Sequence, residues 1–233
     1  GAGAVTNSGT LYANSAALGG SVVVNSGTLY CNPPLLQAAR IINAGTLHGT
    51  SSLQVANGLV NSGTLHAYSG DFTTSVVTNY GTLNLPTNVF AYGQFVNHGT
   101  LNFQRAMTVA TPLTFNGGTV HLAEGSNTLY LTGPITVNTN FNLSSVSTST
   151  IEVSNVVSGP GGITRSGDGW CFVTGDANTY TGPTIVNGGK TLWVGKPGGL
   201  VSARLGPGAI TNNGTLYFDS PLAYTTLGGI SGT

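Results

Sequence analysis

Hydrophobic and polar residues in the first half of the chain follow a pattern with a fixed period of ~18 residues. Each repeat contains the phrase Asn-x-Gly-Thr-Leu, and an apolar residue stands two positions before its asparagine. Apolar residues at alternate positions are typical of a short strand with one buried face. Because turn-forming Asn and Gly separate the apolar positions, the pattern predicts two or three short strands per repeat with turns between them.

Aligning the repeats gives four columns of equivalent residues. The asparagine column consists of Asn7, Asn25, Asn43, Asn61, Asn79 and Asn97. The glycine column consists of Gly9, Gly27, Gly45, Gly63, Gly81 and Gly99. The leucine column consists of Leu11, Leu29, Leu47, Leu65, Leu83 and Leu101. The fourth column, also apolar, consists of Val5, Val23, Ile41, Leu59, Val77 and Phe95. We expect the two apolar columns to form the core.

A unit of this size cannot bury an apolar face alone, so successive units must stack. It is also too short for two helices per repeat, which need roughly 33 residues or more. We therefore predict an all-β chain that forms a right-handed parallel β-solenoid (β-helix), with ~18-residue rungs in its N-terminal half. The predicted domain is 1–233, with regular rungs at 1–116, less regular rungs at 117–158 and final rungs at 159–233.

The glycine and asparagine columns are expected to shape one corner of each rung. We expect the glycines to hold positive φ, where a Cβ would be unfavourable, and the asparagines two positions earlier to bond the turn. Stacking brings like side chains within ~4.8 Å of one another, so the asparagines should also form a ladder of side-chain amides. A row of ligand-binding amides is the less favoured alternative.

Two stretches depart from the regular pattern. Between residues 136 and 155 Thr, Ser and Asn crowd the sequence, which indicates rungs of variable length or with small surface loops. Residues 33–40 begin with two prolines and are expected to form a loop that leads into a strand.

Charged residues make up only 5% of the chain and the net charge is zero, whereas a typical domain is about 25% charged. Neutral polar residues are therefore expected to coat the surface. The six Lys and Arg are scattered along the chain, which argues against nucleic-acid binding. No apolar run approaches the ~18 residues that a membrane-spanning helix needs, so we expect no membrane insertion by this segment.

The residues that could carry catalysis are dispersed. The carboxylates are Asp71, Glu124, Glu152, Asp168, Asp176 and Asp219. Polysaccharide-cleaving β-helix enzymes need clustered carboxylates, a metal or a base of raised pKa, so we expect no enzymatic activity and no cofactor.

One column of planar side chains has more than one possible role. It contains Tyr12, Tyr30, His48 and His66. Without a carboxylate or cysteine in register, the two histidines are not expected to bind a metal. Aromatic faces stack on sugars and on one another, so the column could bind glycans or form a lateral contact between rods, and we favour the structural role.

Cys31 and Cys171 occupy core-facing positions and are expected to pack as small apolar groups. Because several rungs separate them in the sequence, they are expected to lie too far from each other for a disulfide, while intermolecular bonding stays open.

One stretch resembles a known repeat family. It comprises the run Gly161-Gly162-Ile163-Thr164-Arg165-Ser166-Gly167-Asp168-Gly169, residues 175–184 (GDANTYTGPT) and residues 186–189 (VNGG). These residues resemble the autotransporter-associated β-strand repeat, although Trp170-Cys171 stand where that family has Thr-Leu. The resemblance implies a parallel β-helix of a large exported bacterial surface protein, with an extracellular or cell-surface location and an adhesive or structural role.

The last residues of the chain, followed by the first, form a sequence similar to an internal stretch. The tail ends in Leu227, Gly228, Gly229, Ile230, Ser231, Gly232 and Thr233, and the head begins with Gly1, Ala2, Gly3, Ala4 and Val5. Tail followed by head echoes the internal residues 157–167. We hypothesise that the segment is one unit of an axial array, within a longer chain or between subunits, with both ends as self-association sites.

These observations favour a non-enzymatic structural unit of an extracellular filament or cell-surface fibre, whose partner is another copy of itself, head to tail. The alternative is a passenger segment of a surface adhesin that binds glycans, other surface fibres, or host or neighbouring surfaces. A polysaccharide-degrading β-helix enzyme is less favoured.

Overall fold

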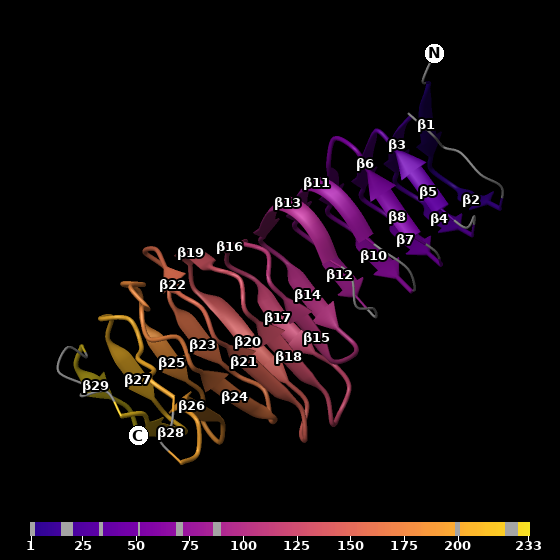
Figure 1. Ribbon diagram of the computed structural model, residues 1–233. Coiled ribbons are helices and arrows are strands. Elements are labelled where there is room, and N and C mark those ends of the chain that lie inside the picture. Colours follow the sequence, from indigo (N-terminus) through magenta and orange to yellow (C-terminus); the bar gives the residue numbers. More distant parts are fainter. Residues whose placement is uncertain are drawn as a thin grey trace. The chain divides into compact units, whose positions relative to one another are not determined.

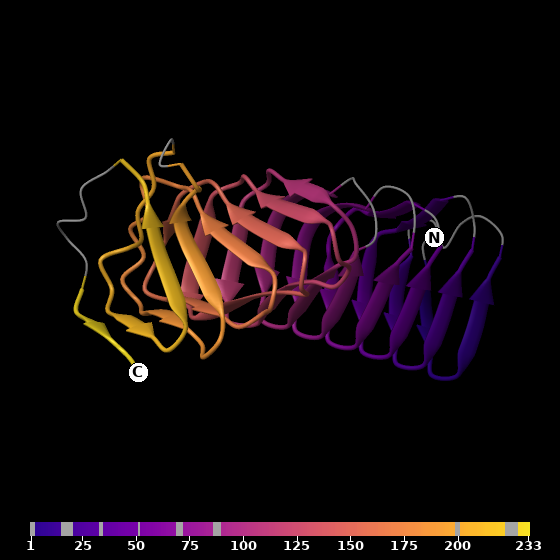
Figure 2. The same cartoon turned by 90° about the horizontal axis from the view of Figure 1, so that it is seen from below.

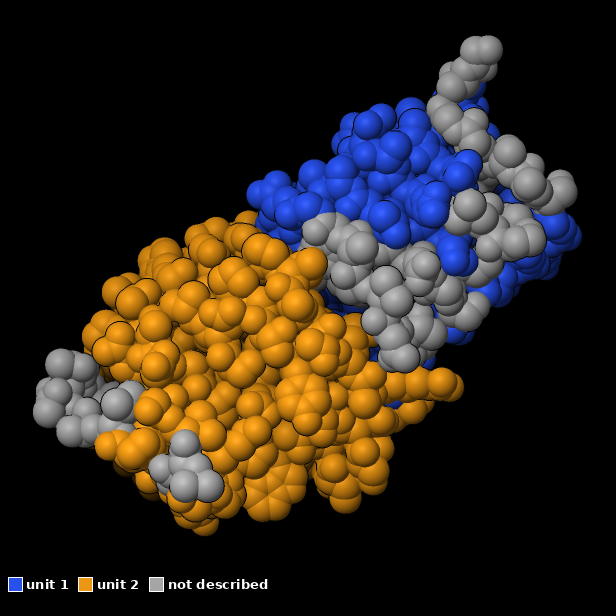
Figure 3. Space-filling model, viewed as in Figure 1, with its two compact units in different colours: residues 1–104 blue, residues 105–233 orange. Residues whose placement is uncertain are grey.

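The computed structural model describes residues 3–14, 21–32, 35–50, 52–68, 72–85, 90–198, 201–221 and 228–233. Every regular element in these ranges is a β-strand, and their pairings are parallel (Figure 1). The chain forms two compact units, residues 1–104 and 105–233 (Figure 3). The predicted all-β parallel β-solenoid is confirmed.

Unit 1, residues 1–104, is built from stacked rungs joined by tight turns, as the indigo-to-purple strands of Figure 2 show. One sheet has the order β1 (Ala4–Asn7), β3 (Val22–Asn25), β6 (Arg40–Asn43), β9 (Leu59–Asn61), β11 (Phe72–Asn79) and β13 (Phe90–Asn97). The other has the order β2 (Thr10–Ala13), β4 (Thr28–Cys31), β7 (Thr46–Gly49), β10 (Thr64–Ala67), β12 (Thr82–Leu85) and β14 (Thr100–Phe103). A branch adds β5 (Leu35–Ala38) and β8 (Ser52–Val55): β5 pairs with β8, and β8 pairs with β11.

The register of unit 1 follows the period of the sequence pattern. Val23 pairs with Ile41, and Leu29 pairs with Leu47, so each core column stacks on itself. Leu29, Leu47, Leu65, Leu83 and Leu101 are completely buried. Full burial of one such side chain contributes roughly 1.5–3 kcal/mol, which is why the alternating pattern selects this register over a shifted one.

Unit 2, residues 105–233, contains three sets of parallel strands. The first set is β16 (Leu113–Asn116), β19 (Ile135–Thr139) and β22 (Val157–Ser158). The second is β17 (Thr119–Leu122), β20 (Phe141–Ser145), β23 (Ile163–Arg165), β25 (Thr184–Val186), β27 (Ile210–Asn212) and β29 (Ile230–Ser231). The third is β15 (Met107–Val109), β18 (Thr128–Leu131), β21 (Thr150–Val153), β24 (Trp170–Val173), β26 (Thr191–Gly195) and β28 (Thr215–Asp219).

Rungs in unit 2 are longer and less uniform than those of unit 1. The step from Met107 to its partner Leu129 is longer than the regular period, and the step from Thr184 to its partner Ile210 is longer still. Residues 136–155, where Thr, Ser and Asn crowd the sequence, lie mostly in the strands β19, β20 and β21. The predicted segments 1–116, 117–158 and 159–233 do not coincide with the two units, and the single domain stays a prediction.

Candidate functional site

The asparagine column forms a continuous hydrogen-bonded ladder in unit 1. The Asn61 Nδ2 donates within its own rung to the Gly63 carbonyl at 3.1 Å. It also donates to two atoms of the next rung, Asn79 Oδ1 at 2.8 Å and the Thr82 carbonyl at 3.0 Å. The same set of bonds begins at Asn7, Asn25, Asn43 and Asn79. The Nδ2 groups of these buried amides are used in hydrogen bonds within the turn and to the next rung. The ladder therefore stabilises the solenoid and has few donors left for a ligand.

The glycine column is required by close stacking, and its predicted positive φ is wrong. The described residues with φ in the left-handed region do not include these glycines. A Cβ added to Gly63 would lie only 2.1 Å from the carbonyl oxygen of Gly45 in the preceding rung. Gly27, Gly45, Gly81 and Gly99 meet the same obstacle at 2.0–2.1 Å. A side chain at this corner would therefore force the rungs apart.

The planar column of unit 1 is stacked face to face. Tyr12 and Tyr30 lie 4.8 Å apart between ring centroids, Tyr30 and His48 4.7 Å, and His48 and His66 4.9 Å, all within 6° of parallel. Each inner ring therefore uses its faces on its neighbours and directs its edge outward. A sugar that stacks on a ring face would have access only at the end of the column, where Tyr12 is 61% exposed.

A further aromatic residue, Tyr68, joins this column beside the histidines. Its hydroxyl lies 3.0 Å from Nδ1 of His48, and its ring is parallel to that of His66 with centroids 5.4 Å apart. Burial, followed by the proximity of His48, lowers the pKa of His66. Sequence reasoning missed Tyr68 because it lies outside the aligned phrases. Its position two residues after His66, directly after β10 ends at Ala67, is the signal that could have found it.

The carboxylates that the structure describes are not gathered in one cluster. Glu152 pairs with Lys196 at 2.8 Å, and Asp168 pairs with Lys190. Among the described residues no three His, Cys, Asp or Glu side chains come together as a metal site would require. Asp71 lies outside the described residues.

The two cysteines are free thiols inside their units. Both are completely buried, and burial raises the pKa of Cys31 to about 12 and that of Cys171 to about 11. Since the thiolate is the reactive form, both side chains act as small apolar groups in the folded chain.

An arginine occupies a core position in the stretch that resembles the autotransporter-associated repeat. Arg165 pairs in register with Leu143 of the preceding rung in the second strand set. Like Leu143 it is fully buried. Its guanidinium donates to the carbonyls of Leu143 at 3.0 Å and Thr191 at 3.1 Å, and also to that of Gly169. Burial lowers the pKa of Arg165. The residue links neighbouring rungs through backbone carbonyls, so its function is structural.

The predicted self-association residues lie in the outermost described rungs. Within the described chain β1 pairs only with β3, and β29 pairs only with β27. Residues Gly3, Ala4, Ile230, Ser231, Gly232 and Thr233 are exposed, and Val5 is half-buried. Gly1, Ala2 and Leu227 lie outside the described residues.

Comparison with known proteins adds no relative. No family model matches the chain, and neither the curated proteins nor the solved structures give a significant match. Within the described ranges the structure has no helix with the length and hydropathy of a membrane span. The resemblance of residues 161–189 to the autotransporter-associated repeat stays a prediction.

Proposed function

We propose that this protein is a non-enzymatic structural unit of an extracellular filament or cell-surface fibre, in which β-solenoid rungs stack end to end. The observation that carries the proposal is the incomplete cover of the outermost rungs. Val5 is half-buried, whereas Val23 beside it is completely buried. Ile230 is 58% exposed, whereas Ile210, its partner in the preceding rung, is completely buried.

An outermost rung also carries backbone N–H and C=O groups on its uncovered side, which pair readily with another strand. The next rung would come from a second copy or from further repeats of a longer chain. A contact between unlike ends that does not close into a ring propagates as a filament. The near absence of charge removes the electrostatic repulsion that keeps many proteins apart. The extracellular location rests on the resemblance of residues 161–189.

Electron microscopy of the purified protein over a series of concentrations tests the proposal. We expect unbranched fibres whose axial repeat equals the length of one copy. Val5→Lys and Ile230→Lys place a charge on each uncovered edge and should leave the protein monomeric in light scattering.

Tyr130→Lys is the matched control, because Tyr130 is exposed but lies in β18, which has a paired strand on both sides. This variant should form fibres as the unmodified protein does. If the unmodified protein stays monomeric, and two copies joined in tandem are no more stable than one, end-to-end stacking is wrong.

A further inference from the structure

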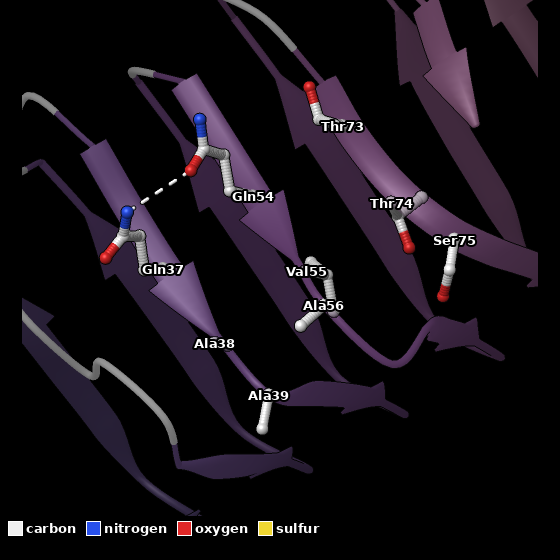
Figure 4. A pocket seen from close by; sticks show the side chains of 9 residues that line it. All are labelled: Gln37, Ala38, Ala39, Gln54, Val55, Ala56, Thr73, Thr74 and Ser75. Atoms are coloured by element: carbon white, nitrogen blue, oxygen red, sulfur yellow. Dashed lines mark hydrogen bonds between the residues drawn. The ribbon is translucent and has the colours of Figure 1, made fainter. Parts of the chain in front are cut away.

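A groove of about 630 Å³ crosses three rungs of unit 1, at the place where the branch of β5 and β8 joins β11. We call it the glutamine groove. Figure 4 shows its lining, which consists of Gln37, Ala38, Ala39, Gln54, Val55, Ala56, Thr73, Thr74 and Ser75. Its volume lies within the range of about 300–1,000 Å³ typical of sites for small ligands.

The sequence makes this groove by interrupting the regular register. The step from Gln37 to its partner Gln54 is one residue shorter than the regular period, and the step from Gln54 to its partner Thr73 is one residue longer. Two rungs therefore still add up to twice the regular period. The chain bends at Ala39 and Ala56, directly after β5 and β8 end, and the side chains of these two residues are only methyl groups (Figure 4). The small side chains leave space beside a row of amide and hydroxyl groups.

The chemistry of the lining is neutral throughout. The Gln37 Nε2 donates to Gln54 Oε1 at 3.2 Å. In the described part of the chain this leaves the Gln37 Oε1 as an acceptor and the Gln54 Nε2 as a donor for another molecule. The backbone near the bend is already paired, with Ala56 N–H on the Ala38 carbonyl at 3.0 Å and Asn57 N–H on the Ala39 carbonyl at 2.7 Å. A bound molecule would therefore meet side-chain amides, hydroxyls and methyl groups.

We propose that the glutamine groove binds a neutral oligosaccharide chain that lies along the solenoid axis. Equivalent polar groups recur on successive rungs roughly 4.8 Å apart, which suits a linear ligand of repeated hydroxyl-bearing units. Sugar hydroxyls pair with the amides and with Thr73 and Ser75, while sugar C–H groups contact Ala39 and Ala56. This activity goes beyond the fibre role and does not depend on it.

Other classes of ligand fit the groove less well. An anionic glycan or a phosphate would lose its hydration without meeting a positive charge, since none of the nine lining residues ionises. A peptide that adds to a sheet needs unpaired backbone groups, and those beside the bend are occupied.

The test is calorimetric titration of the Ile230→Lys variant, so that fibre formation does not affect the result. The probes are cellohexaose, maltohexaose, chitohexaose and mannohexaose, with hexagalacturonate and a neutral Ser/Thr-rich peptide as the competing classes. At least one neutral hexasaccharide should bind. Gln54→Ala should weaken it about tenfold, as expected for loss of a hydrogen-bonding amide. Ala56→Phe fills the groove and should abolish binding.

Asn138→Ala is the matched control, because Asn138 forms an exposed amide pair with Asn116 outside the groove. Its affinity should stay within about twofold of the parent. Circular dichroism checks that each variant is folded, and Gln54→Ala decides alone if Ala56→Phe does not fold. The proposal is overturned if no neutral hexasaccharide binds, if only hexagalacturonate or the peptide binds, or if Gln54→Ala keeps the parent affinity.

Discussion

A methyl group added at two positions of the glycine column meets opposite surroundings. In Gly63→Ala it would lie 2.1 Å from the Gly45 carbonyl oxygen, whereas in Gly9→Ala nothing lies within 4 Å. We expect Gly63→Ala to lower the free energy of unfolding by about 2–4 kcal/mol and Gly9→Ala to change it by less than about 0.5 kcal/mol. Urea denaturation measures both. Equal effects would mean that stacking distance does not explain the glycines.

The amide ladder makes a similar prediction for Asn61, which is completely buried. Asn61→Ala removes the donor to Asn79 Oδ1 and to the Thr82 carbonyl. Unsatisfied buried acceptors and the lost turn bond should destabilise the chain by about 2–4 kcal/mol in urea denaturation. Asn138→Ala breaks an exposed amide pair with Asn116 and should cost under about 1 kcal/mol, so a similar loss in both variants would contradict this interpretation.

The stacked histidines predict a dependence of stability on pH. The native pKa of His66 lies below the ordinary value of 6.5, so the unfolded chain binds more protons between these two values. The contribution of His66 is complete above about pH 6.5 and is lost as the pH falls toward the native pKa. Urea denaturation at pH 7.5 and pH 5 should show a smaller acid loss for His66→Gln than for the parent. His48→Gln should raise the pKa of His66, which its NMR titration reports.

At the scale of strands, the phrases of unit 1 predict both sheets because each core column is apolar throughout. The register of Leu29 on Leu47 follows directly from that uniformity. The branch strands escaped prediction, since the steps from Gln37 to Gln54 and from Gln54 to Thr73 both differ from the regular period and so fall outside the alignment of the phrases. For residues 33–40 the sequence predicts a loop leading into a strand, because they begin with two prolines, and this prediction is wrong for Leu35–Ala38, which form β5.

The strands of unit 2 were less predictable because their rungs differ in length. The inward position of Arg165 has no sequence signal, since a charged residue in a strand ordinarily points to water. Its burial is explained by the carbonyls of Leu143, Gly169 and Thr191, which accept hydrogen bonds from its guanidinium and are brought together only by the fold. The residues of the candidate site that belong to the sequence repeat, as in the asparagine ladder, could therefore be predicted. Those that belong to irregular rungs could not.

The rungs joined by Arg165 should loosen when its guanidinium is removed. Arg165→Met keeps an apolar chain of comparable length but removes the hydrogen bonds to the carbonyls of Leu143, Gly169 and Thr191, so we expect a loss of about 3 kcal/mol or more in the free energy of unfolding. Hydrogen exchange should accelerate in β23, β24 and β26. Arg204→Met, at an exposed arginine, is the control and should change little. Unchanged exchange in Arg165→Met would contradict a linking role.

For the whole molecule, the scarcity of charge predicts stability that is almost independent of salt. Two ion pairs, Asp168 with Lys190 and Glu152 with Lys196, lie among the described residues, and both lysines retain access to solvent. The exposed pair of Asp168 with Lys190 contributes about 0–1 kcal/mol and is screened by salt, whereas Glu152 is buried and its pair with Lys196 is screened much less. The free energy of unfolding should therefore change by less than about 1 kcal/mol between 0.05 and 0.5 M sodium chloride. A larger change would reveal an electrostatic contribution that the contacts do not show.

The side-chain amides of the asparagine column all point the same way along the axis of unit 1. Each Nδ2 donates toward the later rung, from Asn7 through Asn79, while the turn N–H groups of Ser26 and Gly27 donate toward the earlier one. Reversing a neighbouring copy at the Asn7 end would set amide acceptor against amide acceptor, and turn N–H donor against turn N–H donor. A fibre of these units would thus be polar, with two chemically different tips that elongate at different rates.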